Sequence, residues 1–368
     1  MNNKKFKILL LSNRDVCIYN LRLETIIALL DLGYDVTISA PYGVRIEKFK
    51  AMGCHFIETK FDNQGTNMKD DLKLIAHYRK IIRQVKPNVI LTYVAKPNIY
   101  GGIAATKENV PFIANITGLG NALQNDGWVQ KIMILLYRFA FKKVYFVFFQ
   151  NEANVSFFAN KKIKHQASQL LPGSGVNLNK FSPMPYPSKN SEIIFLFVAR
   201  IKKEKGIEHY LQAAKAITAK YANVKFYVCG NCEETYEEML SEYEKSGVIT
   251  YFGMIDDIRE LLKMTHCTVL PTYHEGLSNV LLESAASARP NIATDVNGCK
   301  EVVEDDVTGI LIKPKSTAAL IEGIEKFLSL SYEKQKEMGE KGRKKIEKEF
   351  DRQIVVDAYL EVIASLKR

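Results

Sequence analysis

Two glutamates separated by seven residues, Glu275 and Glu283, occupy the segment of this chain best suited to chemistry. Glu275 follows an apolar run that ends at Pro271, and Glu283 lies in an apolar helical pattern. A strand, a short loop with a glycine and then a helix form an anion site, because the first amide N–H groups of a helix are free and its dipole favours negative charge. We predict that the amides of residues 276–279 point at such an anion.

The spacing of this acidic pair suggests a ligand. Eight residues of helical rise span roughly 12 Å, which is about the length from the sugar to the ribose of a nucleotide sugar. A diphosphate at the helix tip would then have one carboxylate on each side, and each could accept hydrogen bonds from vicinal hydroxyls. The alternative is that Glu275 stabilises the helix terminus electrostatically and that Glu283 is a solvated surface residue.

Basic residues follow another predicted strand. Arg200 ends the apolar run 193–199, and Lys205 stands five residues later at the start of a helical pattern. A guanidinium and an ammonium there suit a leaving diphosphate, because they attract it more strongly as its charge builds in the transition state. The alternative is an ordinary solvated loop. The turn at Met254 could contact a nucleobase edge through its backbone, although a plain strand-to-helix turn explains it equally well.

Length and composition narrow the class of protein. The chain has 368 residues, enough for two domains with cores of their own. Its 47% hydrophobic and 25% charged residues are typical of a soluble globular protein. No apolar run reaches the ~18 residues of a membrane span, and the short apolar patch 8–11 reads as a strand and not as a signal peptide. We therefore expect a cytoplasmic protein.

The net charge of +10 is unevenly distributed. Residues 1–185 contain 25 Lys and Arg against 12 Asp and Glu, whereas residues 186–368 contain 26 against 29. Essentially all the excess positive charge therefore lies in the first half. This asymmetry predicts that the first half meets an acidic partner, which could be a phosphorylated substrate, an anionic membrane or a nucleic acid.

Strand and helix patterns alternate along the chain, which is typical of parallel sheets built from β-α-β units. The proline-rich segment 180–192 interrupts both patterns. We predict an α/β fold with two doubly wound Rossmann-like domains facing each other across a cleft, at 1–183 and 190–350, and a helix at 351–368 that packs back on the first. Strands are expected near 6–12, 35–39, 55–59, 88–94, 111–116, 144–149, 167–171, 192–200, 224–229, 248–252, 267–271, 291–294 and 309–312. Helices are expected near 20–33, 68–86, 98–107, 128–142, 151–160, 316–329, 331–349 and 352–366.

Several segments together resemble the retaining glycosyltransferases of family 4. In the second half these are ARIKKEKG (199–206), HEGLSNVLLE (274–283) and ARPNIATDVNGCKEVVEDDVTG (288–309). In the first half, YVAKPNIYGG (93–102), NITGLGNAL (115–123), VFFQNEAN (147–154) and LPGSGVNLNKFSP (171–183) resemble a bacterial subgroup. That subgroup extends lipid-linked oligosaccharides for capsule, O-antigen or glycan synthesis, commonly with an N-acetylhexosamine. The resemblance implies the GT-B fold, a nucleotide-sugar donor bound by the second domain and an acceptor bound by the first.

The resemblance also implies residue roles. Arg200 and Lys205 match the basic pair on the donor diphosphate, Glu275 matches the glutamate beside the donor sugar, and Glu283 matches the one that binds the ribose hydroxyls. With Met254, these residues form the expected donor site, and Glu275, Arg200 and Lys205 form the expected catalytic set. The loop whose amides approach the phosphate and sugar is matched by Gly276, Leu277 and Ser278.

The acceptor side departs from the family pattern. Many relatives have a histidine after a central strand, where this sequence has Thr117 and Gly118. Retaining chemistry can proceed on one face, with the leaving phosphate oxygen accepting the proton of the acceptor, so no protein base is required. Lys96 and Asn98, at the start of a predicted helix, are expected to hold the pyrophosphate of the acceptor. Because the sequence has no Asp-x-Asp, we expect no metal and no other cofactor.

The segment from Trp128 to Phe149 combines apolar and basic residues. Its helical part is apolar nearly all round and carries Lys131, Arg138, Lys142 and Lys143. One interpretation is a surface that lies on an anionic bilayer. The other is a buried helix whose basic ends reach the solvent.

We therefore predict a metal-independent hexosyltransferase. It would move a sugar, an N-acetylhexosamine or a related hexose, from a UDP-sugar with retention to a polyprenyl-pyrophosphate-linked saccharide. The enzyme would be peripheral on the inner face of the cell membrane and would bind no nucleic acid. One alternative is a UDP-sugar 2-epimerase of the same architecture. A second is a basic nucleic-acid-binding protein, which would need basic residues interleaved with exposed aromatics.

Overall fold

The computed structural model describes residues 5–60, 68–118 and 127–367. The chain divides into two compact units: unit 1 comprises Met1–Ser174 and Gln353–Arg368, and unit 2 comprises Gly175–Arg352. Residues 175–183 thus lie in unit 2, although the sequence placed them in the first domain. The reason is a pair of backbone hydrogen bonds, from the Val176 N–H to the Phe350 oxygen at 2.9 Å and from the Arg352 N–H to the Val176 oxygen at 3.0 Å.

Unit 1 is built on a seven-stranded parallel sheet with the strand order β3-β2-β1-β4-β5-β6-β7. Its inner strands are buried along most of their length, as expected when helices cover both faces of a parallel sheet. The strands are β1 (Lys7–Leu11), β2 (Asp35–Ala40), β3 (His55–Glu58), β4 (Val89–Tyr93), β5 (Phe112–Ile116), β6 (Phe146–Phe149) and β7 (Ser168–Leu170).

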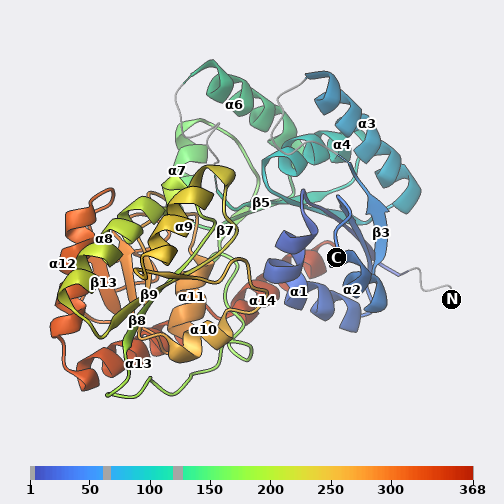
Figure 1. Ribbon diagram of the computed structural model, residues 1–368. Helices are drawn as coiled ribbons and strands as arrows, with labels where there is room; N and C mark the ends of the chain where they lie inside the picture. The colour runs from blue at the N-terminus through green and yellow to red at the C-terminus, as the bar shows by residue number, and fades with distance from the viewer. Residues whose placement is uncertain (1–4, 61–67, 119–126, 368) are drawn as a thin grey trace. The chain divides into compact units, whose positions relative to one another are not determined.

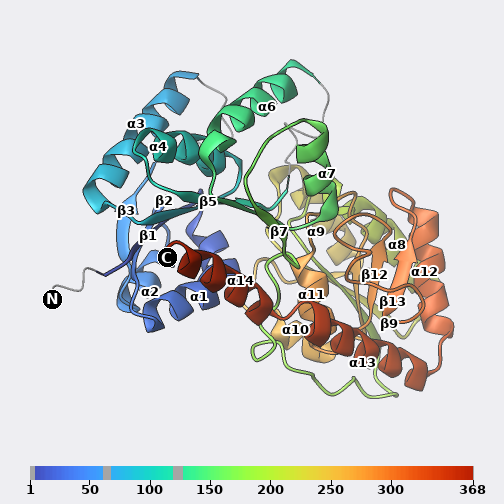
Figure 2. The same ribbon diagram turned by 180° about the vertical axis from the view of Figure 1, so that it is seen from behind.

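The helices of unit 1 form a layer on each face of this sheet (Figure 1). The first layer comprises α3 (Met68–Val85), α4 (Gly102–Lys107), α6 (Trp128–Ala140) and α7 (Glu152–Asn160). The second comprises α1 (Asp15–Asp31), α2 (Ile46–Ala51) and α14 (Arg352–Ser365). Short turns precede α4 at η1 (Pro97–Gly101) and follow α6 at η2 (Phe141–Lys143). Seen from behind, α14 runs beside α1 (Figure 2), and Val355, Tyr359 and Ile363 are buried among the side chains of the second layer.

Unit 2 repeats this plan with a six-stranded parallel sheet in the order β10-β9-β8-β11-β12-β13. One layer contains α8 packed against α12, and the other contains α11 packed against α13. The strands are β8 (Ile193–Val198), β9 (Val224–Cys229), β10 (Thr250–Tyr251), β11 (Cys267–Leu270), β12 (Asn291–Thr294) and β13 (Gly309–Ile312). The helices and short turns are η3 (Lys203–Lys205), α8 (Ile207–Lys220), η4 (Glu234–Tyr236), α9 (Glu237–Lys245), α10 (Arg259–Met264), α11 (Asn279–Ala286), α12 (Thr317–Ser329) and α13 (Tyr332–Glu349).

All thirteen predicted strands appear close to their expected positions, and the sheets are parallel as predicted. The helix predicted at 20–33 begins earlier, at Asp15, whose carboxylate accepts the Arg45 N–H at 3.1 Å. The helix predicted at 98–107 begins as the wider η1 turn. Among the described helices, none combines the length and apolarity needed to cross a bilayer.

Strand order defines where each sheet can hold a ligand. In unit 1, β2 and β3 are added on one side of β1, and the chain then crosses over to place β4 on the other side. In unit 2, β9 and β10 lie on one side of β8, and β11 lies on the other. Helices on opposite faces diverge at such a switch point, which leaves a crevice beyond the carboxyl ends of the two strands. The residues that follow these four strands are therefore the first candidates for a functional site.

Candidate functional site

The switch point of unit 2 carries three of the residues that the sequence singled out. Arg200 and Lys205 follow β8, and Glu275 follows β11, the neighbouring strand. The Lys205 Nζ and the Glu275 Oε1 are in direct contact as an ion pair. Their side chains are only 18% and 15% exposed, so the pair is well shielded from water. Arg200 is exposed.

The backbone around Lys205 is fixed by the loop that follows β11. The Glu204 oxygen accepts hydrogen bonds from the Tyr273 N–H at 2.9 Å and the Thr272 hydroxyl at 3.1 Å. Gly206 has a φ of +76°, and a Cβ there would lie 2.0 Å from the Pro271 oxygen. Only glycine fits this close approach without strain. The η3 turn and the Glu275 loop are thus held as one structure across some seventy residues of sequence.

A second loop, at Gly298, positions Glu275 from its other side. A Cβ on Gly298, whose φ is +85°, would lie 2.6 Å from the Glu275 Cβ and 2.8 Å from its carbonyl carbon. The Gly298 oxygen accepts the Ser278 N–H at 2.9 Å, and the Gly298 N–H donates to Glu301 Oε2 at 2.6 Å. Sequence reasoning assigned no role to Gly298. The Asn-Gly turn signal after the strand at 291–294 could have pointed to it.

The helix after this loop is α11 (Asn279–Ala286), and two expectations need correction. The Ser278 amide, predicted to be available to an anion, donates to the Gly298 oxygen instead. Glu275 also lies four residues before α11 begins, so helical rise does not set its separation from Glu283. The predicted helix does carry Glu283, and Gly276 and Leu277 lie partly exposed ahead of it.

Glu283 is partly buried, so it is not a solvated surface residue. Burial raises the pKa of its carboxyl to about 7, while Lys180 and Arg352 pull the pKa down and Asp257 raises it further. Asp257 itself is held by Arg259, whose guanidinium lowers the Asp257 pKa to about 2. Glu283 therefore stands in a charged neighbourhood that includes two cations, neither of which the sequence had assigned to it.

Met254 lies on the loop after β10 and is 65% exposed. The preceding Gly253 has a φ of +64°, and its oxygen accepts the Gly230 N–H at 2.8 Å. This hydrogen bond ties the loop to the end of β9. Met254 is thus an accessible residue beyond the carboxyl edge of the same sheet.

The structure corrects the prediction for Asn98 in unit 1. Asn98 is 1% exposed. Its Oδ1 accepts the Thr92 hydroxyl at 2.7 Å, and its Nδ2 donates to the Asn115 oxygen at 2.8 Å. An amide used in this way braces β4 against β5 and is not presented to a ligand. The η1 turn places Asn98 inside the unit, whereas the sequence predicted a helix start at which Asn98 holds the pyrophosphate of the acceptor.

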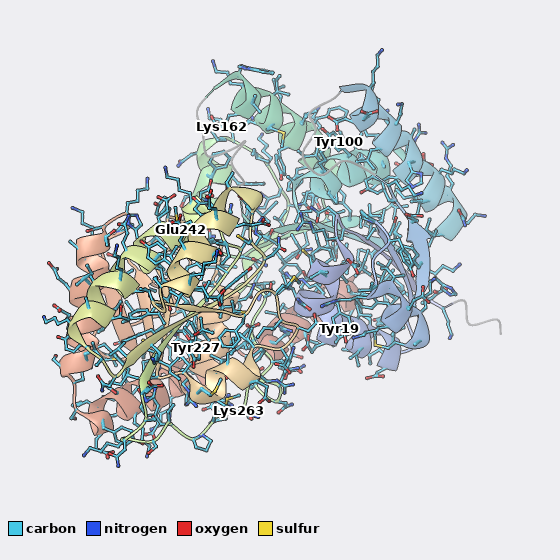
Figure 3. The ribbon with its side chains drawn as sticks, in the orientation of Figure 1. Tyr19, Tyr100, Lys162, Tyr227, Glu242 and Lys263 are labelled. Atoms are coloured by element: carbon cyan, nitrogen blue, oxygen red, sulfur yellow. The ribbon has the colours of Figure 1, made fainter. Side chains whose placement is uncertain are left out.

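The other predicted acceptor residues lie nearer the surface. The Lys96 Nζ is 3.7 Å from the Asp71 Oδ1, and both side chains are partly buried. Tyr100, labelled in Figure 3, also hydrogen-bonds Asp71, and burial together with this carboxylate raises its pKa. Thr117 is partly exposed and Gly118 is exposed, directly after β5. Residues 119–123 of the segment NITGLGNAL lie outside the described residues.

Comparison with known proteins finds a family match for most of each unit. Residues 179–345 match the family described as glycosyl transferases group 1, and residues 7–151 match the family described as glycosyl transferase 4-like. The chain is 27% identical to the N,N'-diacetylbacillosaminyl-diphospho-undecaprenol alpha-1,3-N-acetylgalactosaminyltransferase of Campylobacter jejuni, over 96% of both chains. It is 26% identical to the capsular polysaccharide biosynthesis glycosyltransferase CapM of Staphylococcus aureus, over 87% of both chains.

Solved structures share the fold at low sequence identity. Alr3699/HepE of Anabaena, crystallised with UDP and glucose, superposes with a TM-score of 0.79 at 15% identity, over 98% of this chain and 100% of that one. The sucrose-phosphate synthase of Thermosynechococcus elongatus superposes with a TM-score of 0.80 at 17% identity, over 98% and 99%. With the two family matches, these likenesses confirm the predicted fold and the predicted resemblance: the chain belongs to the GT-B glycosyltransferases.

Proposed function

We propose that this glycosyltransferase moves a sugar from a UDP-sugar, with retention of anomeric configuration and without a metal, to a polyprenyl-diphosphate-linked saccharide. The sugar is an N-acetylhexosamine or a related hexose, and the product serves capsule, O-antigen or glycan synthesis. One observation carries this proposal. The Lys205–Glu275 ion pair lies at the switch point of unit 2, beyond the end of β8, the strand that the exposed Arg200 also follows.

The ion pair provides both charges that a nucleotide sugar needs. Lys205 and Arg200 supply positive charge for the diphosphate, and Glu275 supplies a carboxylate for the sugar hydroxyls. In the structure, Lys205 and Glu275 form an ion pair and neutralise each other. When the donor binds, its diphosphate takes up part of the Lys205 charge. Glu275 then accepts hydrogen bonds from the sugar, and Glu283 accepts them from the ribose.

The reaction breaks the bond between the anomeric carbon and the β-phosphate oxygen and forms a bond to the acceptor hydroxyl on the same face. The electrons of the broken bond stay with the phosphate, so its negative charge increases, and that phosphate oxygen accepts the proton lost by the acceptor. Arg200 and Lys205 bind this state more strongly than the ground state, and this difference lowers the barrier. The products are the extended glycoside and UDP.

The relatives support the two substrates. The Campylobacter jejuni relative is named for an undecaprenol-diphosphate-linked acceptor and for transfer of N-acetylgalactosamine. Alr3699/HepE, which shares the fold, was crystallised with UDP and glucose. We assign the acceptor to unit 1, where Lys96, Thr117 and Gly118 lie beyond the carboxyl ends of β4 and β5. A lipid-linked acceptor lies in a membrane, so the enzyme works at a membrane surface, which we take to be the anionic inner face of the cell membrane.

The test is a panel of UDP-sugars incubated with and without a short-chain polyprenyl-diphosphate N-acetylhexosamine. We expect one donor to give acceptor-dependent UDP release, a product heavier by one sugar and an NMR coupling constant that reports retention. Activity should persist in EDTA. UDP release with a free sugar product and no need for acceptor would instead identify a 2-epimerase. A salt-sensitive gel shift of random RNA without sugar transfer would identify the nucleic-acid binder.

The donor-site assignment has its own test. Arg200→Ala and Glu283→Ala should each weaken UDP-sugar binding by about tenfold or more, since each removes a charge-assisted contact. Isothermal titration calorimetry measures this directly. If binding and turnover of both variants stay within about twofold of the native protein, the donor does not occupy this part of unit 2.

A further inference from the structure

Helix α6 has two faces with opposite surroundings. Gln130, Ile134, Tyr137 and Ala140 are buried against unit 1. On the other side, a row of four apolar side chains is exposed, at spacings of four, three and four residues. These are Trp128 (73% exposed), Ile132 (47%), Leu135 (65%) and Phe139 (52%), and we call them the α6 stripe.

At ~100° per residue, the members of the α6 stripe fall within roughly 60° of one another around the helix. The buried face lies nearly opposite, so α6 packs on unit 1 without using the side chains of the α6 stripe. Isolated exposed apolar residues are common on soluble proteins, but a contiguous row on one helix face marks a contact with something outside the molecule. The exposed row argues against one of the two interpretations of the sequence, because α6 is not a buried helix with only its basic ends in solvent.

Basic side chains surround one end of the α6 stripe. Arg138 is exposed on α6 and donates two hydrogen bonds to the Lys161 oxygen, at 3.0 and 2.6 Å. That contact brings the segment after α7 alongside α6. The Lys142 Nζ lies 5.6 Å from the centre of the Phe139 ring. The basic cluster formed in this way comprises Arg138, Lys142, Lys143, Lys161, Lys162 (labelled in Figure 3) and Lys164.

We propose that the α6 stripe inserts into the interface of an anionic lipid bilayer, with α6 lying in the membrane plane and the basic cluster meeting the headgroups. The inference rests on the proposed function, because it supplies the surface from which a lipid-linked acceptor is taken. An apolar row with a tryptophan and flanking lysines matches a bilayer interface, where rings sit at headgroup depth and lysine chains reach the phosphates. A protein partner would need no such band of positive charge.

The direction of α6 connects this surface to the acceptor residues. β5 ends at the carboxyl edge of the unit 1 sheet and is followed by Thr117 and Gly118. Phe139 lies in the last turn of α6, and the basic cluster comes from that turn, from η2 and from the segment after α7. β5 and β6 are parallel neighbours, so the helix between them runs back from the carboxyl edge of the sheet, and the Trp128 end of α6 lies nearer that edge than the Phe139 end does. We place the diphosphate of a membrane-embedded acceptor at this end of α6.

The chain contains a built-in reporter for the test, because Trp128 is its only tryptophan. Full-length protein is titrated with vesicles of phosphatidylcholine plus phosphatidylglycerol, or of phosphatidylcholine alone, at low and high salt. With the anionic vesicles at low salt we expect a blue shift of Trp128 fluorescence, quenching by brominated lipid and co-sedimentation. Binding should weaken strongly with salt and with phosphatidylcholine alone.

The matched pair of variants is Leu135→Gln and Leu32→Gln. Both leucines are exposed in unit 1, at 65% and 60%, but Leu32 lies at the end of α1, outside the stripe. Leu135→Gln should lower the vesicle partition coefficient by about tenfold, and Leu32→Gln should leave it unchanged. Lys142→Gln with Lys143→Gln should also lower it by about tenfold or more. The charge-matched control is Lys215→Gln with Lys245→Gln, two exposed positions in unit 2.

Equal vesicle binding by Leu135→Gln and Leu32→Gln would overturn the proposal, as would binding that ignores lipid charge and salt. Sedimentation velocity tests whether the α6 stripe instead binds a second copy of the chain. A dimer that Leu135→Gln dissociates, with vesicle binding unchanged, would make the stripe a subunit interface and would also overturn the proposal. None of these readouts requires turnover. If no donor supports transfer but the vesicle pattern holds, the proposed function fails and the membrane surface stands.

Discussion

The two units have the same sheet plan but use their switch points differently. In unit 2, Arg200 and Lys205 follow β8 and Glu275 follows β11; Lys205 and Glu275 form an ion pair, and Arg200 is exposed. In unit 1, the polar residues on and after β4, one of the two strands at the switch point, bond to those of its neighbour β5 inside the protein. A shared fold therefore supplies two similar edges, and side-chain chemistry decides what each of them presents to a ligand.

The interior network of unit 1 explains this difference. The Asn115 Nδ2 donates to the Thr92 oxygen at 3.0 Å, and its Oδ1 accepts the hydroxyl of Tyr359 from α14. Arg22 is 3% exposed, with its guanidinium 5.3 Å from the Tyr93 ring centre and 5.7 Å from that of Tyr359. The cation is thus stabilised by aromatic faces. These polar groups anchor the C-terminal helix in unit 1 and are not available to a substrate.

Of the substitutions that test this contrast, we expect the largest loss of activity from Glu275→Gln. Glu275→Gln keeps the shape of the side chain but removes the charge that pairs with Lys205 and, in our proposal, contacts the sugar. We expect kcat/KM to fall about 100- to 1000-fold, measured by acceptor-dependent UDP release. Glu304→Gln, an exposed glutamate of the same unit, is the control and should change kcat/KM by less than about twofold. An equal and small effect of both variants would remove Glu275 from the reaction.

A substitution of Gly298 tests whether the loop at this residue positions Glu275. In Gly298→Ala, the new Cβ would lie 2.6 Å from the Glu275 Cβ, so the loop must move. We expect donor affinity to fall about tenfold and the free energy of unfolding to fall by ~1–3 kcal/mol. Gly247→Ala is the matched control, since it has a φ of +74° and no atom within 4 Å of its added Cβ. Gly247→Ala should lower the free energy of unfolding and leave donor affinity unchanged. Donor affinity lost equally in both variants would argue against a positioning role for Gly298.

A substitution of Asn98 tests whether this residue of unit 1 stabilises the fold and does not bind the acceptor. Asn98→Ala leaves the Thr92 hydroxyl and the Asn115 oxygen without their buried partner, which costs ~1–3 kcal/mol of unfolding free energy. We expect this loss in urea denaturation, with the acceptor KM unchanged. A tenfold rise of the acceptor KM at native stability would instead restore Asn98 to the acceptor site, as the sequence first suggested.

The smallest effect expected is the pH dependence that Glu283 introduces. Burial raises its pKa from 4.5 to about 7, so the folded protein holds the proton longer than the unfolded chain does. Glu283 therefore costs stability as pH rises from about 4.5 to 7, up to ~3 kcal/mol above that range. Glu283→Gln should remove this decline in thermal or urea unfolding.

Donor binding should follow the same ionisation. If only the carboxylate form of Glu283 binds the ribose, affinity should rise about threefold between pH 6.5 and 7.5. Calorimetric titration across this range measures the effect, with Glu283→Gln as the flat reference. A native protein whose donor affinity is as flat as that of the variant would show that Glu283 does not contact the donor through its charge.

The sequence predicted much of the fold because strand and helix patterns are local. Alternating apolar runs placed all thirteen strands and implied parallel sheets. It missed the short helix α2, whose six residues carry too little periodicity, and it ended the first domain at 183 instead of 174. The domain error arose because Val176 pairs with residues near 350, and a local pattern contains no information about such a distant partner.

For the candidate site, the sequence by itself determined the chemistry. The types and order of Arg200, Lys205, Glu275 and Glu283 follow directly from the chain, and so does their place after predicted strands or on a predicted helix. Tertiary structure alone decided which of these groups meet. The pairing of Lys205 with Glu275, the burial of Asn98 and the exposed row of α6 all depend on contacts between segments distant in sequence. Side-chain type is set by each residue, whereas burial and pairing are set by whatever the fold packs against it.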